Sequence, residues 1–93
     1  MSAAPLRLEV LTPDGDRLVE EEVEAVVVHR REARFAVGSE VAILPGHAPA
    51  LIRIPEAPLR YRVHGREVTV ALGAGYVEVM DGRVRVLAAV LAR

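Results

Sequence analysis

The chain consists of short segments in which apolar and polar residues alternate, and this pattern restricts the fold more than any other feature of the sequence. Leu6, Leu8 and Val10 alternate with Arg7 and Glu9, and a period of two residues places the apolar side chains on one face of a β-strand. Similar segments recur along the chain with turn-forming residues between them. The sequence therefore predicts an all-β fold, a flattened antiparallel β-sandwich or barrel of about nine to ten short strands. The expected strands cover residues 6–10, 17–19, 24–29, 34–37, 41–44, 50–54, 59–63, 68–72, 77–79 and 84–86.

The segments between these strands have the chemistry of turns. Asp81–Gly82 is a strong signal for a two-residue hairpin turn. Gly65–Arg66 is also expected to turn the chain, because the apolar residues of the strands before and after it alternate so that they fall on the same face. The glycines in residues 73–75 predict a kink or bulge. Pro55–Pro58 should interrupt a strand, and the acidic run Glu20–Glu22 is expected to be a solvated bend.

Two segments allow more than one local structure. Residues 23–34 contain Glu, Ala and Arg, which suit a helix, but the run Val26–Val28 is β-branched and favours a strand. We therefore expect a strand at 24–29, a charged hairpin tip at Arg30–Ala33 and a returning strand at 34–37. Residues 87–93 could begin a helix, but one so short gains too little from packing to be stable.

The composition describes one small domain with an aliphatic core. The 93 residues are 52% hydrophobic and only 3% aromatic, so Val, Leu, Ala and Ile must fill the interior. The net charge is −1 and all 12 basic residues are Arg, so no strong field attracts nucleic acid or anionic lipid. The absence of cysteine excludes disulfides and a cysteine nucleophile. A membrane-spanning helix needs about 20 apolar residues, which no segment offers, so membrane association is expected only through a partner.

No group of residues in the sequence indicates catalysis. His29, His47 and His64 do not have the spacing of metal ligands, and a metalloenzyme would require them to converge in space. Ser39 lies outside any Gly-x-Ser-x-Gly motif. Residues 73–75 lack the following Lys and helix of a phosphate-binding loop. We therefore expect no catalytic residue, no metal and no cofactor.

The segment from Ala42 to Leu51 is the one place where the sequence specifies a particular local structure. Pro45 fixes its own φ and Gly46 tolerates a positive φ, which suits the two central positions of a type II turn. Pro49 keeps the residue before it extended. The predicted result is a rigid corner between two strands with His47 at its tip. Its apolar side chains either dock another protein, at a small ordering cost, or pack beneath their own loop.

The sequence of this corner resembles a known family. Residues 43–51, Ile-Leu-Pro-Gly-His-Ala-Pro-Ala-Leu, are similar to the characteristic motif of the epsilon subunit of F-type ATP synthases. The resemblance extends to residues 6–15, which are similar to the family's first strand and turn, and to residues 70–88, which are similar to its closing strands. The chain is therefore identified as a single epsilon-like β-sandwich domain over residues 1–93.

The resemblance implies a role without catalysis. A member of this family is a central-stalk (rotor) subunit that links the gamma subunit to the c-ring of a proton-translocating F-type ATP synthase. It helps to couple proton flow to ATP synthesis and needs no cofactor. The resemblance further implies a peripheral protein at the cytoplasmic face of the bacterial cell membrane, with no nucleic acid partner.

The same resemblance implies which residues meet the partners. Glu40 and His47 would lie near the c-ring, where Glu40 could meet a basic loop residue, while Leu44 and Leu51 could contribute to the contact with gamma. The expected protein-interaction residues are Glu40, Leu44, Pro45, Gly46, His47 and Leu51.

The sequence departs from the family at two places. Residues 29–39 are longer and more basic than the family's short turn, so the tip at Arg30–Arg31 could alter contacts beside the ring. The family generally continues into a regulatory C-terminal helical hairpin, and because the sequence ends at Arg93 we expect that domain to be absent. The alternative hypothesis is a stand-alone β-sandwich that binds a ligand or peptide, for which a pocket with convergent polar groups would be the sign.

Overall fold

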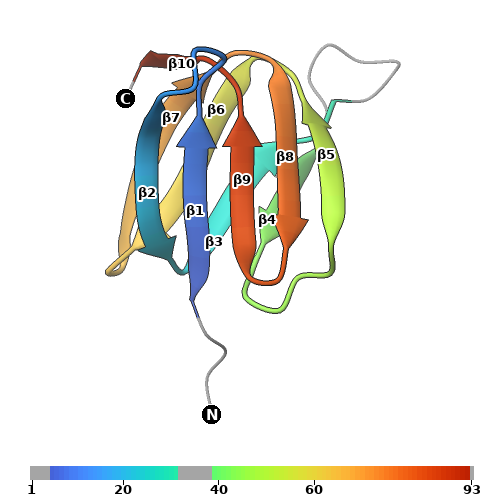
Figure 1. Ribbon diagram of the computed structural model, residues 1–93. Helices are drawn as coiled ribbons and strands as arrows, with labels where there is room; N and C mark the ends of the chain where they lie inside the picture. The colour runs from blue at the N-terminus through green and yellow to red at the C-terminus, as the bar shows by residue number, and fades with distance from the viewer. Residues whose placement is uncertain (1–4, 32–38, 93) are drawn as a thin grey trace.

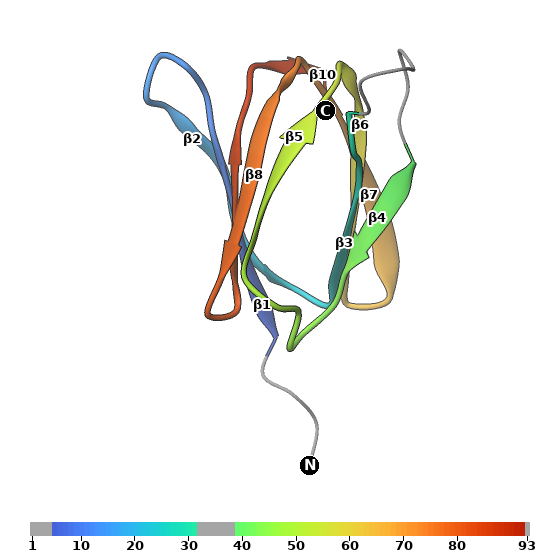
Figure 2. The ribbon, with the colours of Figure 1, turned by 90° about the vertical axis from the view of Figure 1, so that its right-hand side faces the viewer.

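Two five-stranded sheets face each other in the computed structural model, which describes residues 5–31 and 39–92 (Figures 1 and 2). The strands are β1 (Leu6–Leu11), β2 (Arg17–Val23), β3 (Ala25–His29), β4 (Glu40–Ile43), β5 (Ala50–Ile54), β6 (Ala57–Val63), β7 (Arg66–Leu72), β8 (Gly75–Met80), β9 (Arg83–Leu87) and β10 (Val90–Ala92). The front sheet of Figure 1 has the order β2-β1-β9-β8-β5, and the rear sheet has the order β10-β7-β6-β3-β4. Within the described ranges there is no helix. The predicted all-β sandwich is confirmed.

The strand pairs in both sheets are antiparallel, except that β1 runs parallel to β9. Leu8 lies opposite Val84 and Val10 lies opposite Val86. This pair places the first strand of the chain beside one of the last. It therefore joins the β1–β2 hairpin to the β8–β9 hairpin within one sheet.

Each sheet turns an aliphatic face towards the other. Alternation along the strands supplies these faces: Leu6, Leu8 and Val10 of β1 are buried, and Val86 of β9 is completely buried. Tyr61 is the only aromatic side chain in the core that the described residues form. The aliphatic interior expected from the composition is confirmed.

Two hairpins have positive φ at both central residues, as type I′ turns require for strands with a right-handed twist. In the β8–β9 hairpin Asp81 and Gly82 have φ of 49° and 75°, and in the β6–β7 hairpin His64 and Gly65 have φ of 52° and 73°. The predicted turn at Asp81–Gly82 is confirmed. The other turn begins one residue earlier than predicted, because His64 and not Arg66 is one of its two central residues.

Residues 73 and 74 take the chain from β7 in the rear sheet to β8 in the front sheet, so the kink predicted there is a crossover between the sheets. The backbone N–H of Gly73 donates a hydrogen bond to the carbonyl of Ala89 (2.9 Å). Gly75 begins β8 in close contact with the backbone of β9: a Cβ atom there would lie 2.0 Å from the carbonyl oxygen of Leu87.

Three segments differ from the sequence prediction. Glu20–Glu22 is not a bend but part of β2, since its backbone pairs with β1 along its whole length. Residues 90–92, where the sequence predicted neither a strand nor a stable helix, form β10, because the free edge of β7 offers them backbone partners. Pro58 lies inside β6, and β3 pairs only with residues 60–62, so the missing N–H of Pro58 costs no hydrogen bond with β3. The strand expected at 34–37 lies outside the described residues.

Candidate protein-interaction site

The predicted corner joins the two sheets. Residues 44–49 carry the chain from β4 in the rear sheet to β5 in the front sheet, at the same end of the sandwich as the β6–β7 and β8–β9 hairpins (Figures 1 and 2). The backbone N–H of His47 donates a hydrogen bond to the carbonyl of Leu44 (3.0 Å), and Gly46 has a φ of 87°. This bond and this φ belong to a type II turn with Pro45 before the glycine, so the predicted turn is confirmed.

The ring of His47 is held by its neighbour in the chain. Its Nδ1 lies 2.7 Å from the carbonyl oxygen of Ala48, and because a carbonyl only accepts, Nδ1 must carry the proton of this hydrogen bond. The half-buried ring is thereby oriented, and in its neutral form Nε2 can accept a hydrogen bond from another molecule.

Two leucines of the predicted site point to solvent. Leu44 is 55% exposed and Leu51 is 71% exposed, whereas the adjacent Ile43 and Ile52 are buried. Of the two alternatives for these side chains, packing beneath their own loop is therefore wrong for both leucines. The corner leaves them free to cover an apolar surface of another molecule.

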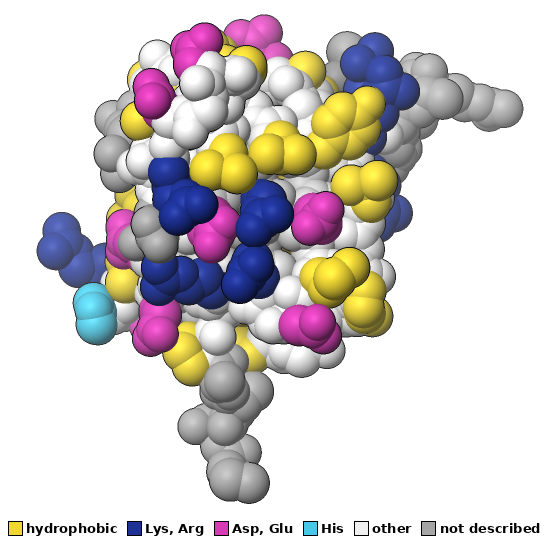
Figure 3. All heavy atoms as spheres, in the orientation of Figure 1, with side chains coloured by type: hydrophobic (Ala, Val, Ile, Leu, Met, Phe, Trp, Pro, Cys, Tyr) yellow, Lys and Arg dark blue, Asp and Glu magenta, His cyan; other side chains and the backbone are white. Residues whose placement is uncertain are grey.

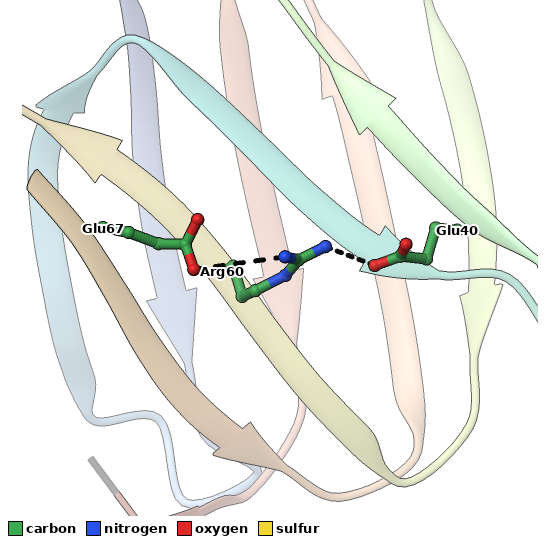
Figure 4. A network of polar contacts seen from close by, with 3 residues as sticks. All are labelled: Glu40, Arg60 and Glu67. Atoms are coloured by element: carbon green, nitrogen blue, oxygen red, sulfur yellow. Dashed lines mark hydrogen bonds and ion pairs between the residues drawn. The ribbon is translucent and has the colours of Figure 1, made fainter. Parts of the chain in front are cut away.

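Glu40 lies apart from the corner. It begins β4, whereas the corner follows the end of that four-residue strand, so about 13 Å of strand separates Glu40 from Leu44. Its carboxylate forms an ion pair with Arg60 of β6, and the same guanidinium lies 4.0 Å from the carboxylate of Glu67 on β7 (Figure 4). The structure thus brings together residues 44–51 and places Glu40 in a separate network on the outer face of the rear sheet.

Further exposed apolar side chains, which were not among the predicted interaction residues, lie on the outer face of the front sheet. Tyr76 and Leu87 stand opposite each other on β8 and β9, and both are exposed. Leu51 lies on β5, the neighbour of β8. Figure 3 displays hydrophobic side chains across this face above a group of arginines. The alternation of buried and exposed residues along each strand could have predicted their exposure, because each of them is adjacent to a buried residue such as Val77 or Val86.

Arginines from β9 cover a carboxylate on the same face. Glu9 of β1 is only 6% exposed, although Leu8 and Val10 on either side of it face the core. Nε of Arg85 donates to Oε2 of Glu9 (3.4 Å), and Nε of Arg83 lies 3.9 Å from Oε1. Long arginine side chains can shield a carboxylate from water while keeping their own charges solvated. This cluster stabilises the β1–β9 pair.

Two hollows on the described surface are small. One of about 70 Å³ lies beside Arg60, and one of about 170 Å³ lies beside Met80 and Arg83, whereas pockets for small molecules usually measure about 300–1,000 Å³. These two hollows do not favour the alternative of a ligand-binding module. Within residues 5–31 and 39–92, no group of three or more His, Cys, Asp or Glu side chains could hold a metal ion. The same ranges contain no helix with the length and apolarity to cross a membrane.

The fold and the corner define a class of protein, a two-sheet β-sandwich domain that exposes a rigid apolar corner between its sheets. Within that class the chain belongs to the ATP synthase delta/epsilon chain β-sandwich domain family, whose family model matches residues 5–93. The membership predicted from the corner motif is confirmed.

Curated relatives are named as ATP synthase epsilon chains. The ATP synthase epsilon chain of Desulfitobacterium hafniense (strain DSM 10664 / DCB-2) is 36% identical over 86 residues, which cover 92% of this chain and 60% of that protein. The ATP synthase epsilon chain of Solibacter usitatus (strain Ellin6076) is 39% identical over 88 residues, which cover 95% of this chain and 60% of that protein. The chain therefore spans about 60% of the length of these relatives.

Two solved structures have the same fold. A chain in the Euglena gracilis mitochondrial ATP synthase OSCP/F1/c-ring assembly matches with a TM-score of 0.79 and 21% identity, over 98% of this chain and 56% of that chain. A chain in the Tetrahymena thermophila mitochondrial ATP synthase central stalk and c-ring matches with a TM-score of 0.67 and 15% identity, over 95% of this chain and 66% of that chain. At these identities the likeness establishes the fold alone.

Proposed function

We propose that this protein is a non-catalytic central-stalk (rotor) subunit of a proton-translocating F-type ATP synthase. In this role it links the gamma subunit to the c-ring and helps to couple proton flow to ATP synthesis. The observation that carries the proposal is the match of the delta/epsilon family model to residues 5–93. The names of the curated relatives support it. The protein would be peripheral at the cytoplasmic face of a bacterial membrane, held there by its partners.

The c-ring contact is proposed to involve Glu40 and the corner. Pro45 and Gly46 shape a turn that is already closed by a hydrogen bond, so docking the corner would lose little conformational entropy. His47 would offer Nε2 to a partner group. Glu40 would meet a basic residue of a ring loop, since its carboxylate is exposed on an edge strand.

The gamma contact is proposed to use apolar side chains. Leu44 and Leu51 are exposed, and burial of a leucine side chain contributes about 1.5–3 kcal/mol. Leu51 lies in the same sheet as the exposed Tyr76 and Leu87, so a partner seated over β5 could extend across β8 and β9.

Co-expression with the gamma subunit and c-ring of the same organism tests this function. We expect a complex with both partners to survive purification at moderate salt. Glu40→Gln should weaken binding to the c-ring by about 1.4- to 5-fold, which corresponds to the free energy that an exposed ion pair contributes. The matched control is Glu56→Gln, an exposed carboxylate in the turn between β5 and β6, which should bind like the unaltered protein. Recovery of neither partner with folded protein would refute the proposed function.

A further inference from the structure

Arg60 bridges two carboxylates that come from strands on either side of it. Its Nη2 donates to Oε2 of Glu40 on β4, and its Nη1 lies 4.0 Å from Oε1 of Glu67 on β7 (Figure 4). The order β7-β6-β3-β4 means that the side chain of Arg60 must reach across β3 to contact Glu40. The bridge therefore spans four strands of the rear sheet.

Val27 and Ala42, the residues of β3 and β4 in register with Arg60, are short, whereas Glu40 lies two residues away along β4, opposite His29. Val27 of β3 lies opposite Arg60 on one side and opposite Ala42 of β4 on the other. Val27 also lines the hollow of about 70 Å³ beside Arg60. The guanidinium therefore crosses β3 diagonally to reach Glu40, and a long side chain at position 27 would obstruct it at the start of this path.

The bridge restrains a carboxylate that would otherwise be mobile. Glu40 is the first residue of an edge strand, and its side chain is 53% exposed, so alone it would sample several rotamers. The guanidinium contacts Oε2, and within residues 5–31 and 39–92 Oε1 makes no hydrogen bond. Glu40, Arg60 and Glu67 together carry a formal charge of −1, because Glu67 offsets the charge of the arginine. The ion pair with Arg60 therefore leaves these three residues with a negative formal charge.

We propose that Arg60 is a positioning residue, which fixes the Glu40 carboxylate so that its second oxygen is ready to accept a hydrogen bond from a basic group of the stalk partner. The inference rests on the proposed function, in which Glu40 meets such a group. Arg60 contributes by lowering the ordering cost of binding, and Glu67 contributes by holding the other side of the guanidinium.

Arg60→Met, with Arg62→Met as its matched control, tests this role. Both arginines lie on β6 and line the same hollow, but no contact ties the Arg62 side chain to a carboxylate of the described chain. Binding to the detergent-solubilised c-ring with gamma should weaken by about 2- to 5-fold for Arg60→Met: the cost of ordering one long side chain sets the lower value, and the whole contribution of the Glu40 contact sets the upper one. Arg62→Met should bind like the unaltered protein. Binding of Arg60→Met that is equal or tighter would overturn the proposal, since tighter binding would mean that Arg60 competes with the partner for Glu40.

Two further measurements separate positioning from a structural effect. In the Arg60→Met background, the further change Glu40→Gln should weaken binding less than it does in the unaltered protein. Arg60→Lys should bind more tightly than Arg60→Met but less tightly than the unaltered protein, because lysine keeps the positive charge but lacks the two parallel N–H donors of a guanidinium. The thermal midpoint should stay unchanged, since exposed ion pairs contribute little to stability. Additive losses or a lowered midpoint would contradict a positioning role.

The outcome remains informative if the proposed function fails. Should the unaltered protein bind neither the ring nor gamma, side-chain NMR relaxation of Glu40 in the free protein decides whether Arg60 restrains it. The Glu40 side chain should become more mobile in Arg60→Met and stay as it was in Arg62→Met. Equal mobility in all three proteins would overturn the positioning role independently of any partner.

Discussion

Replacing Gly75 with alanine introduces one methyl group where β8 passes closest to the backbone of β9. The added Cβ would lie 2.0 Å from the carbonyl oxygen of Leu87 and 3.0 Å from the Cβ of Ala88. Neither neighbour is the end of a flexible side chain, so the strands themselves must move apart. Overpacking of this kind costs about 1–3 kcal/mol, and a backbone clash belongs at the upper end of that range.

The entropic gain of a Gly→Ala change opposes this cost. Loss of glycine from the unfolded chain stabilises a protein by about 0.4–1 kcal/mol, so the net loss for Gly75→Ala should be about 2 kcal/mol. For a domain of this size, that corresponds to a fall in the thermal midpoint of about 8–16 °C. Thermal unfolding followed by far-UV circular dichroism measures it.

Gly73→Ala is the matched control for this experiment. It lies two residues away and has no positive φ, but its added Cβ would lie 3.7 Å from the nearest atom, the Cβ of Ala89. With ordinary contacts and the same entropic gain, its midpoint should stay the same or rise by a few degrees. Equal midpoints for the two variants would refute the close approach of β8 to β9 on which the reasoning depends.

The remaining predictions concern the core and the corner. Ile54→Asp and Val86→Asp should each abolish the cooperative thermal transition, because both place an unpaired charge at a buried position, whereas His47→Ala should leave the midpoint nearly unchanged. Similar losses in all three would contradict the exposed position of the corner. Leu8→Ala should cost about 2–5 kcal/mol in denaturant unfolding, and Leu51→Ala less than about 0.5 kcal/mol, since only the first is buried. A reversed order would mean that Leu51 packs in the core.

Much of the proposed site could be predicted because its structure is local. Pro45 and Gly46 set the backbone of the corner by their own φ preferences, and the structure has the turn that they specify. The exposure of Leu44 and Leu51 could not be decided in this way. Whether a loop covers its own apolar residues depends on where the two sheets place its ends, which no local preference encodes.

The bridge from Glu40 through Arg60 to Glu67 could not be predicted either. These residues are separated in sequence by 20 and 7 positions, and nothing in their local pattern pairs them. Arg60 and Glu40 meet across β3, which lies between β6 and β4, because Val27, the residue of β3 opposite Arg60, is short. Strand order is a global property, so a contact across three strands becomes visible only when the sheet is assembled.

The sequence by itself determined the elements of this protein: the alternating strands, the Asp81–Gly82 turn, the rigid corner and an aliphatic interior. These follow from side-chain period and backbone preference, which act within a few residues. Only the tertiary structure decided the parallel pairing of β1 with β9, the extension of β2 through Glu20–Glu22 and the addition of β10. Each of these depends on backbone hydrogen bonds offered by a strand elsewhere in the chain, and such a partner can override the local preference of the segment it receives.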